Sequence, residues 1–340
     1  MRRQNLTTLF ALAAVTMLSS VVSAQSQVNA KPAPPAKAWT MPRTPDGKPD
    51  LQGVYSNAQT IPVARPAYLG AKEFYTDETD KEASAKAAPA GRGGRGGPAR
   101  AGVAANPEGG LAVHYDNSQF GLGGSSITRA ASLRTSIITG PEGRVPPLTP
   151  AAQKLLADRR AYQQVHQWDS AQNRPLAERC ITWGFEGPPM MPVGYNSTLE
   201  IVQGKGYVGI VQEMIHDTRV IPTDGRPHGP AEIKRWMGDS VGHWEGDTLV
   251  VETVNYNPLV MVQGGPLSDA AKVTERFTRV DANTVQYQFT VDDPKTWVKP
   301  FSGEYNMVHI DGPVYEYACH EGNYGMANNL SGERATEKKK

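Results

Sequence analysis

The feature that most constrains the fold is a series of short alternating segments joined by tight turns over residues 206–321. Three pairs of segments, SVGHW and TLVVETVNY, AKVTERFTRV and TVQYQFTVDD, and GEYNMVHI and VYEYACHE, are separated by EGD, DAN and DGP. These separators are typical of hairpin turns. No helical period intervenes, so the sequence predicts a mainly β fold with an antiparallel meander. Because a long open sheet leaves bare edges, we expect it to close into a lipocalin-like barrel; a sandwich is the alternative.

Several of these segments place a carboxylate on an otherwise apolar face. In KVTERFTR, Glu275 shares a face with Val273 and Phe277, and in YVGIVQEMI, Glu213 shares a face with Val211, because side chains two residues apart point to the same side of a strand. A buried carboxylate needs a partner or a shifted pKa. Two interpretations stay open. These groups line a polar ligand cavity inside the barrel, or they form structural ion pairs or lie at strand ends in water.

The stretch DGRPHGPAEIKRWMGDSVGHWEGD, residues 224–247, concentrates histidine, arginine and carboxylate side chains around two turn sequences. Histidine carries protons near neutral pH, and arginine can hold an anionic substrate. We predict acid–base roles for His228 and Glu213. The predicted substrate-binding residues are Arg219, Asp224, Arg226, Asp239 and Glu275. We expect His228, Glu213, Arg219, Arg226 and Asp239 to meet at one rim of the barrel; the alternative is that the stretch is only turn chemistry.

The sequence predicts no cofactor. His216, His228 and His243 could converge on one rim, but the chain has neither an HExxH motif nor an HxH spacing. A divalent metal ion therefore stays an alternative without assigned ligands. Ser240 lies in GDSVG without a recognisable nucleophile elbow, so no serine nucleophile is predicted.

The N-terminus predicts export. Arg2 and Arg3 precede the apolar run LFALAAVTML, and small residues at Ser23 and Ala24 then form a plausible signal-peptidase site. The apolar run is far shorter than the ~20 residues of a spanning helix, so we expect no stable membrane insertion. The sequence thus predicts an exported, periplasmic or extracellular protein.

Export determines how the only two cysteines are interpreted. Cys180 and Cys319 should form a disulfide in an oxidising compartment, and such a long loop would stabilise the fold by roughly 4–5 kcal/mol on the chain-entropy model. A reactive thiol is the competing interpretation. Without the signal the formal charge changes from +1 to −1, because Arg2 and Arg3 are lost. A nearly neutral protein gives no electrostatic reason to expect nucleic acid as a partner.

Composition divides the rest of the chain. GRGGRGGPAR resembles an RNA-binding tract, but a disordered linker fits an exported protein better. In PPLTPAAQKLLADRRAYQQ, Thr149 is a natural N-cap and Pro150 occupies the first helical position. The predicted layout is a signal peptide (1–24), a flexible leader (25–38), an N-terminal extension docking on the barrel (39–75), a disordered Gly/Arg/Ala linker (76–110), a connecting segment with an outer helix at about 150–166 (111–177), the β-barrel domain (178–326) and a tail (327–340).

The chain resembles a family of exported soil-bacterial proteins of unassigned activity. The shared pattern appears here as PDLQGVY, LRTSIITGPEGRVPPLTP, ERCITWGFEGPP, RVIPTDGRPH, WMGDSVGHWEGDTLVVETVNY, ERFTRVDANTVQYQFTVDDP and YEYACHEGNYGM. It covers most of residues 40–332. The resemblance implies export and a single module, and it carries over neither a reaction nor a catalytic residue.

Two functions follow as hypotheses. The first is an enzyme acting on a small polar or carbohydrate-like substrate, by hydrolysis or by lyase- or isomerase-type proton transfer, in a barrel pocket. The second is a non-catalytic protein that binds a small ligand or a polysaccharide. Sugar stacking would suit the aromatic side chains of Trp183, Tyr195, Trp236, Trp244 and Tyr324. Convergent histidines and carboxylates in a cleft favour the enzyme, whereas exposed aromatic side chains favour the binder. A scaffold protein would have no substantial pocket. The oligomeric state is left open.

Overall fold

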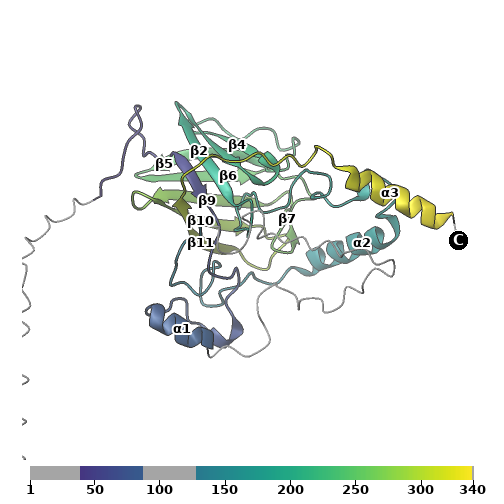
Figure 1. The fold of residues 1–340 in the computed structure, drawn as a ribbon, viewed down its shortest axis with the longest axis horizontal. Helices are drawn as coiled ribbons and strands as arrows, with labels where there is room; N and C mark the ends of the chain where they lie inside the picture. The colour runs from purple at the N-terminus through teal and green to yellow at the C-terminus, as the bar shows by residue number, and fades with distance from the viewer. Residues whose placement is uncertain (1–38, 87–127, 339–340) are drawn as a thin grey trace, which may run out of the picture. The chain divides into compact units, whose positions relative to one another are not determined.

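The computed structural model describes residues 39–86 and 128–338 (Figure 1). The predicted signal peptide, the leader, residues 87–110 of the predicted linker and the start of the connecting segment lie outside the described residues.

Within the described residues, nine strands form one antiparallel sheet in the order β4-β3-β2-β1-β11-β10-β9-β6-β5. Its two outer strands approach each other side by side, so that the sheet is a nearly closed barrel (Figure 1). The prediction of a mainly β, antiparallel barrel is confirmed. The strands are β1 Gly53–Ser56, β2 Thr198–Gly204, β3 Tyr207–Gln212, β4 Thr218–Pro222, β5 Asp239–Glu245, β6 Thr248–Val254, β9 Lys272–Arg279, β10 Thr284–Asp292 and β11 Phe301–His309.

One strand comes from the N-terminal extension. β1 lies between β2 and β11, where Tyr55 pairs with Leu199 on one side and His309 on the other. The extension therefore contributes a strand to the barrel rather than docking outside it. β1 also explains why the third predicted hairpin does not form. β11 already has β10 and β1 as neighbours, so VYEYACHE has no edge to join, and residues 310–323 run as irregular chain.

Two of the three predicted hairpins form, and the residues of their turns favour the turn conformations. In the EGD turn between β5 and β6, Gly246 adopts φ +59°, a left-handed conformation that suits glycine. In the DAN turn between β9 and β10, the Asp281 carboxylate accepts a hydrogen bond from the backbone N–H of Asn283 at 2.7 Å. A separate two-stranded ribbon, β7 (Met261–Val262) and β8 (Gly265–Pro266), lies outside the main sheet.

Apolar side chains fill the inside of the barrel, as the period-two pattern requires. On β9, Val273, Glu275 and Phe277 are all buried, while the residues between them are half-buried. The core continues on the other strands with Leu199, Ile201, Val208, Ile210, Ile221, Leu249, Val251, Val285, Tyr287, Phe289, Val291, Tyr305 and Met307. The inside of the barrel is therefore a packed apolar core that also encloses the Glu275 carboxylate.

The predicted outer helix is α2, Pro150–His166, in which the Thr149 hydroxyl caps the N-terminus by accepting from the Ala152 N–H at 3.2 Å. Two further helices are described: α1 (Glu78–Lys86) and α3 (Tyr324–Glu337). α1 corrects the start of the predicted disordered linker. An ion pair between Lys72 and Asp80, at 2.6 Å, holds it to the preceding segment.

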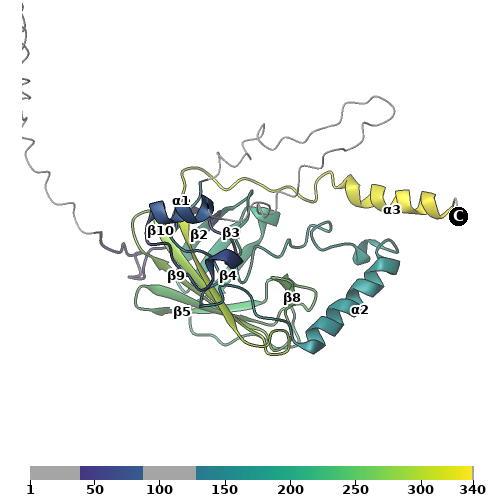
Figure 2. The ribbon, with the colours of Figure 1, turned by 90° about the horizontal axis from the view of Figure 1, so that it is seen from below.

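α3 occupies most of the predicted tail and lies alongside the region of α2 in both views (Figures 1 and 2). Its Arg334 side chain donates to the backbone oxygens of Trp168 and Asp169, at 2.9 Å each. Short 3-10 helices are η1 (Ala67–Leu69), η3 (Ala171–Asn173) and η4 (Met214–His216). Over the described ranges, no helix combines the length and apolarity needed to cross a membrane.

Candidate functional site

Two predicted substrate-binding residues, Arg219 and Glu275, form an ion pair inside the barrel. Arg219 on β4 donates from both terminal nitrogens to the Glu275 carboxylate on β9, and the two side chains are 4% and 0% exposed. The Tyr287 hydroxyl donates to the same carboxylate at 2.8 Å and accepts from the Met190 N–H, also at 2.8 Å. Burial, together with the Glu275 charge, raises the pKa of Tyr287 well above its usual 10.0. This network matches the ion-pair alternative, because solvent does not reach it.

Two other predicted binding residues, Asp224 and Arg226, pair only with each other. The Arg226 guanidinium donates to the Asp224 carboxylate, with Nε–Oδ1 at 2.9 Å, and both side chains are exposed in the turn that follows β4. Such an ion pair in water contributes little to stability. The pair fits the interpretation of this part of the stretch as turn chemistry.

His228 and Asp239 do come together, as predicted. His228 Nδ1 lies 3.0 Å from Asp239 Oδ2, which also accepts from the Gly229 N–H at 2.8 Å. On the other side of the ring, Nε2 lies 3.5 Å from the Glu252 carboxylate but is buried without a hydrogen-bond partner among the described residues. The contact with Asp239 orients the imidazole as in a His–Asp dyad, but Nε2 is closed off from a substrate.

Glu213 lies away from this dyad. Its carboxylate accepts from the Asn196 side chain at 2.9 Å. β3 ends at Gln212 and the chain turns through η4, so the strand alternation that predicted the facing of Glu213 stops one residue too early. Glu213 precedes β4 and His228 follows it. The five residues of β4 place its two ends roughly 16 Å apart.

The prediction that all five residues share one rim is therefore corrected. No described hydrogen bond or ion pair links Glu213 or Arg219 to His228. Arg219 points into the barrel, whereas Glu213 and His228 lie beyond opposite ends of β4. An extended strand carries the chain from one end of the barrel to the other, so Glu213 and His228 lie far apart although they are close in sequence.

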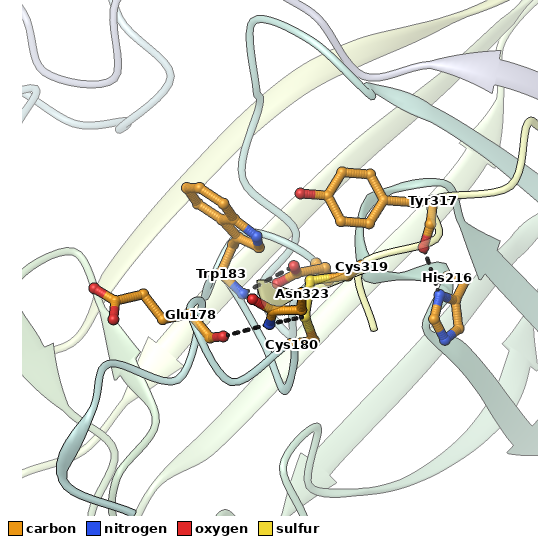
Figure 3. Close-up of a disulfide and its surroundings, with 8 residues drawn as sticks. Glu178, Cys180, Trp183, His216, Tyr317, Cys319 and Asn323 are labelled. Carbon is orange, nitrogen blue, oxygen red and sulfur yellow. Dashed lines mark hydrogen bonds between the residues drawn. A yellow bond between two sulfur atoms is a disulfide. The ribbon is translucent and has the colours of Figure 1, made fainter. Parts of the chain in front are cut away.

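The predicted disulfide between Cys180 and Cys319 is present, with Cα atoms 5.7 Å apart (Figure 3). It pins the irregular C-terminal segment to the start of the ERCITWGFEGPP stretch. Two hydrogen bonds support it: the Asn323 side chain donates to the Glu178 carbonyl at 3.0 Å, and His216 Nδ1 lies 2.8 Å from the Tyr317 carbonyl (Figure 3).

A half-buried acid, Asp217, follows His216 in the chain. Burial, and secondarily the Glu186 charge, raise the pKa of Asp217 to about 6, and Asp217 Oδ2 is buried with no described hydrogen-bond partner. The preceding residues, Ile215 and His216, have φ of 60° and 47°, and a β-branched residue seldom adopts this left-handed conformation. Glu186 is better satisfied, since it accepts from the backbone N–H groups of Trp183 and Phe185 at 3.0 Å each.

The site that sequence reasoning missed is a cleft of about 850 Å³ outside the barrel. One wall is α2, the other is the chain from Gln172 to Gly184, and Leu259 and Met261 complete the lining. Trp183, predicted for sugar stacking, lies on its rim and is 39% exposed. Its other lining residues are Leu156, Arg159, Arg160, Tyr162, Gln163, Gln167, Asn173, Arg174, Pro175, Leu176, Ala177, Arg179 and Thr182.

Four arginines line this cleft, and none of its described lining residues is acidic. Arg174 is neutralised by Glu178, with Nε–Oε2 at 2.9 Å, and stacks on Trp168 with its guanidinium carbon 3.8 Å from the ring centroid. No described carboxylate pairs with the other three. The cleft could not be read from sequence because its walls come from separate segments, and the arginines of α2 look like an ordinary solvated helix face.

The other aromatic residues predicted for sugar stacking do not line the cleft. Trp236 and Trp244 pack against the barrel core, while Tyr324 is exposed at the start of α3. Ser240 is buried near the start of β5, where its hydroxyl shares a hydrogen bond of 2.8 Å with Thr253 Oγ1, and it lies in the strand rather than on a nucleophile elbow. Across residues 39–86 and 128–338, no group of three or more His, Cys, Asp or Glu side chains is arranged to hold a metal ion.

Neither the comparison with protein-family models nor the comparison with curated protein sequences finds a match for this chain.

Proposed function

We propose that the chain is an exported ligand-binding protein that holds a saccharide-like small molecule in the cleft beside α2. The observation that carries this proposal is the lining of the cleft, in which an exposed indole and apolar side chains alternate with side-chain amides. Export rests on the predicted signal peptide, and the disulfide agrees with it.

The lining suits a sugar. Trp183 and Tyr162 are both partly exposed at the cleft and offer flat apolar surfaces to the C–H face of a ring. Gln163, Gln167 and Asn173 each combine an amide donor and acceptor, as sugar hydroxyls require. A cleft of about 850 Å³ has the size of small-molecule sites.

Binding is favoured over catalysis because none of the predicted acid–base residues lines the cleft. His228 and Glu213 lie elsewhere, and the described residues that line the cleft include no histidine, carboxylate or thiol. The enzyme stays a second candidate on one observation, the contact of His228 with Asp239. That candidate requires His228→Asn to abolish a turnover found by substrate screening, without altering saccharide binding at the cleft.

Fluorescence titration of the mature protein with a panel of oligosaccharides tests the binding proposal. A cleft ligand should perturb tryptophan emission, and Trp183→Ala should weaken binding by about 10-fold or more, since removing a stacked aromatic costs on the order of 1–2 kcal/mol. Tyr315→Ala is the matched control, because Tyr315 is 69% exposed and lies outside the cleft. Equal loss in both variants, or unchanged binding in Trp183→Ala, would count against the cleft.

A further inference from the structure

We infer that the ligand of this cleft is an acidic saccharide, one that carries carboxylate or sulfate groups. The inference rests on the proposed function and adds the charge of the ligand. It follows from the clustering in one cleft of three arginines that have no described carboxylate partner.

Three guanidinium groups face the cleft without a described acidic partner. Arg159 donates to the Pro258 carbonyl at 3.0 Å, and Arg179 donates to the Gln172 carbonyl at 3.3 Å. Each of these bonds uses one nitrogen and orients the group, leaving other N–H donors for a ligand. Arg160 is exposed, and no hydrogen bond or ion pair to it is found in the described part of the chain. An oxyanion is the partner that such planar donor sets match.

The sequence of α2 itself leaves two of these charges uncompensated. On a helix, ion pairs form between residues three or four apart. Asp158 is paired in this way with Lys154 at 2.7 Å. For Arg159 and Arg160, the positions three and four residues away on either side are leucine, alanine, tyrosine or glutamine. A merely solvated helix face would more often carry acids there.

The charged side chains that line the cleft from both walls are all positive. α2 contributes Arg159 and Arg160, and the opposite wall contributes Arg179. The whole chain has a formal charge of only +1, so the positive charge of the cleft lining does not reflect a generally basic chain. A cleft of one charge sign concentrates counter-ions of the other sign. Together with the aromatic and amide lining, this selects a sugar that bears anionic groups.

Three predictions for binding follow from this geometry. An acidic oligosaccharide should bind at least about 10-fold more tightly than its neutral ester, because a charged hydrogen bond contributes about 1.5–3 kcal/mol. Arg160→Gln and Arg179→Gln should each remove about 10-fold of that affinity. Added salt should weaken acidic ligands and leave neutral ones nearly unchanged.

Isothermal titration calorimetry with trigalacturonate, its trimethyl ester, a sulfated galactose oligosaccharide and decanoate tests the inference. The expected result is binding of one or both acidic sugars, with loss in Arg160→Gln. Lys205→Gln is the matched control, because it removes one positive charge from an exposed turn outside the cleft and should bind like the parent protein.

Each of the other possible results would refute either the acidic character of the ligand, its identity as a saccharide, or both. Equal affinity for the ester and the acid, sensitive to Trp183→Ala, would refute the acidic ligand and keep the saccharide cleft. Binding of decanoate alone would refute the saccharide. Binding of none of these probes would refute both the inference and the proposed function. A comparison of galacturonate with the sulfated sugar separates the two anionic groups.

Discussion

Removing one member of the buried Arg219–Glu275 pair should destabilise the barrel far more than removing both. Glu275→Gln keeps the size of the side chain and takes away its charge, while Arg219→Met keeps an apolar stem. The Arg219 and Glu275 side chains are 4% and 0% exposed, so water cannot replace the lost partner.

The loss of stability in Glu275→Gln is set by the unpaired charge that stays buried in the barrel. In Glu275→Gln the Arg219 guanidinium is left buried without a counter-charge, and its Nε already lacks a described partner. Breaking a buried pair in this way costs about 3–5 kcal/mol. For a chain of this size about 1 kcal/mol shifts Tm by roughly 2–4 °C, so we expect a loss of roughly 6–20 °C. The double variant should recover most of that loss, since no unpaired charge remains.

Urea denaturation followed by tryptophan fluorescence measures the four corners of this double-mutant cycle. Arg276→Met is the control on the same strand, because Arg276 points outward and pairs with Glu245 at 2.9 Å on the surface. Its loss should stay within about 1 kcal/mol. A loss below about 1 kcal/mol in Glu275→Gln, or additive losses in the double variant, would refute the buried-pair account. Weaker saccharide binding in the folded double variant would instead restore the ligand role predicted from sequence.

Three further changes test other parts of the fold. Because burial raises the pKa of the Asp217 carboxyl from 3.8 to about 6, the folded state binds the proton more tightly, and stability falls as pH rises across that window. Asp217→Asn should therefore raise Tm at about pH 8 and not at about pH 3.5; equal shifts at both would contradict the assignment. Cys180→Ser with Cys319→Ser should cost roughly 4–5 kcal/mol in urea denaturation, and an unchanged midpoint would show that the loop constraint is unimportant. Gly303→Ala would place a Cβ 2.4 Å from Phe289 Cζ and should cost about 1–3 kcal/mol by overpacking, whereas a neutral effect would mean that the ring moves freely.

Most of the strand pattern, two of the three predicted hairpin turns, the α2 cap and the disulfide could be predicted from the sequence. The strands, turns and cap depend on information carried by a few neighbouring residues, whereas the disulfide follows from the predicted export and from there being only two cysteines. Alternation sets which side chains share a face, so Glu275 was expected beside Val273 and Phe277, and all three are buried. Thr149 caps α2 because its hydroxyl is three residues from the N–H that it bonds.

The partners of these elements are decided only by the tertiary structure. β1 is inserted between β2 and β11, which follow it by more than a hundred residues, and this insertion removes the edge that VYEYACHE would have joined. The curvature of the sheet into a barrel brings Arg219 on β4 into contact with Glu275 on β9, although the two strands are not neighbours in the sheet. The candidate cleft also depends on distant segments, since α2, Arg179 and Met261 meet there. Local conformational preference acts over a few residues, whereas packing selects among many long-range pairings. The chemistry of both the ion pair and the cleft therefore exists only once the chain has folded.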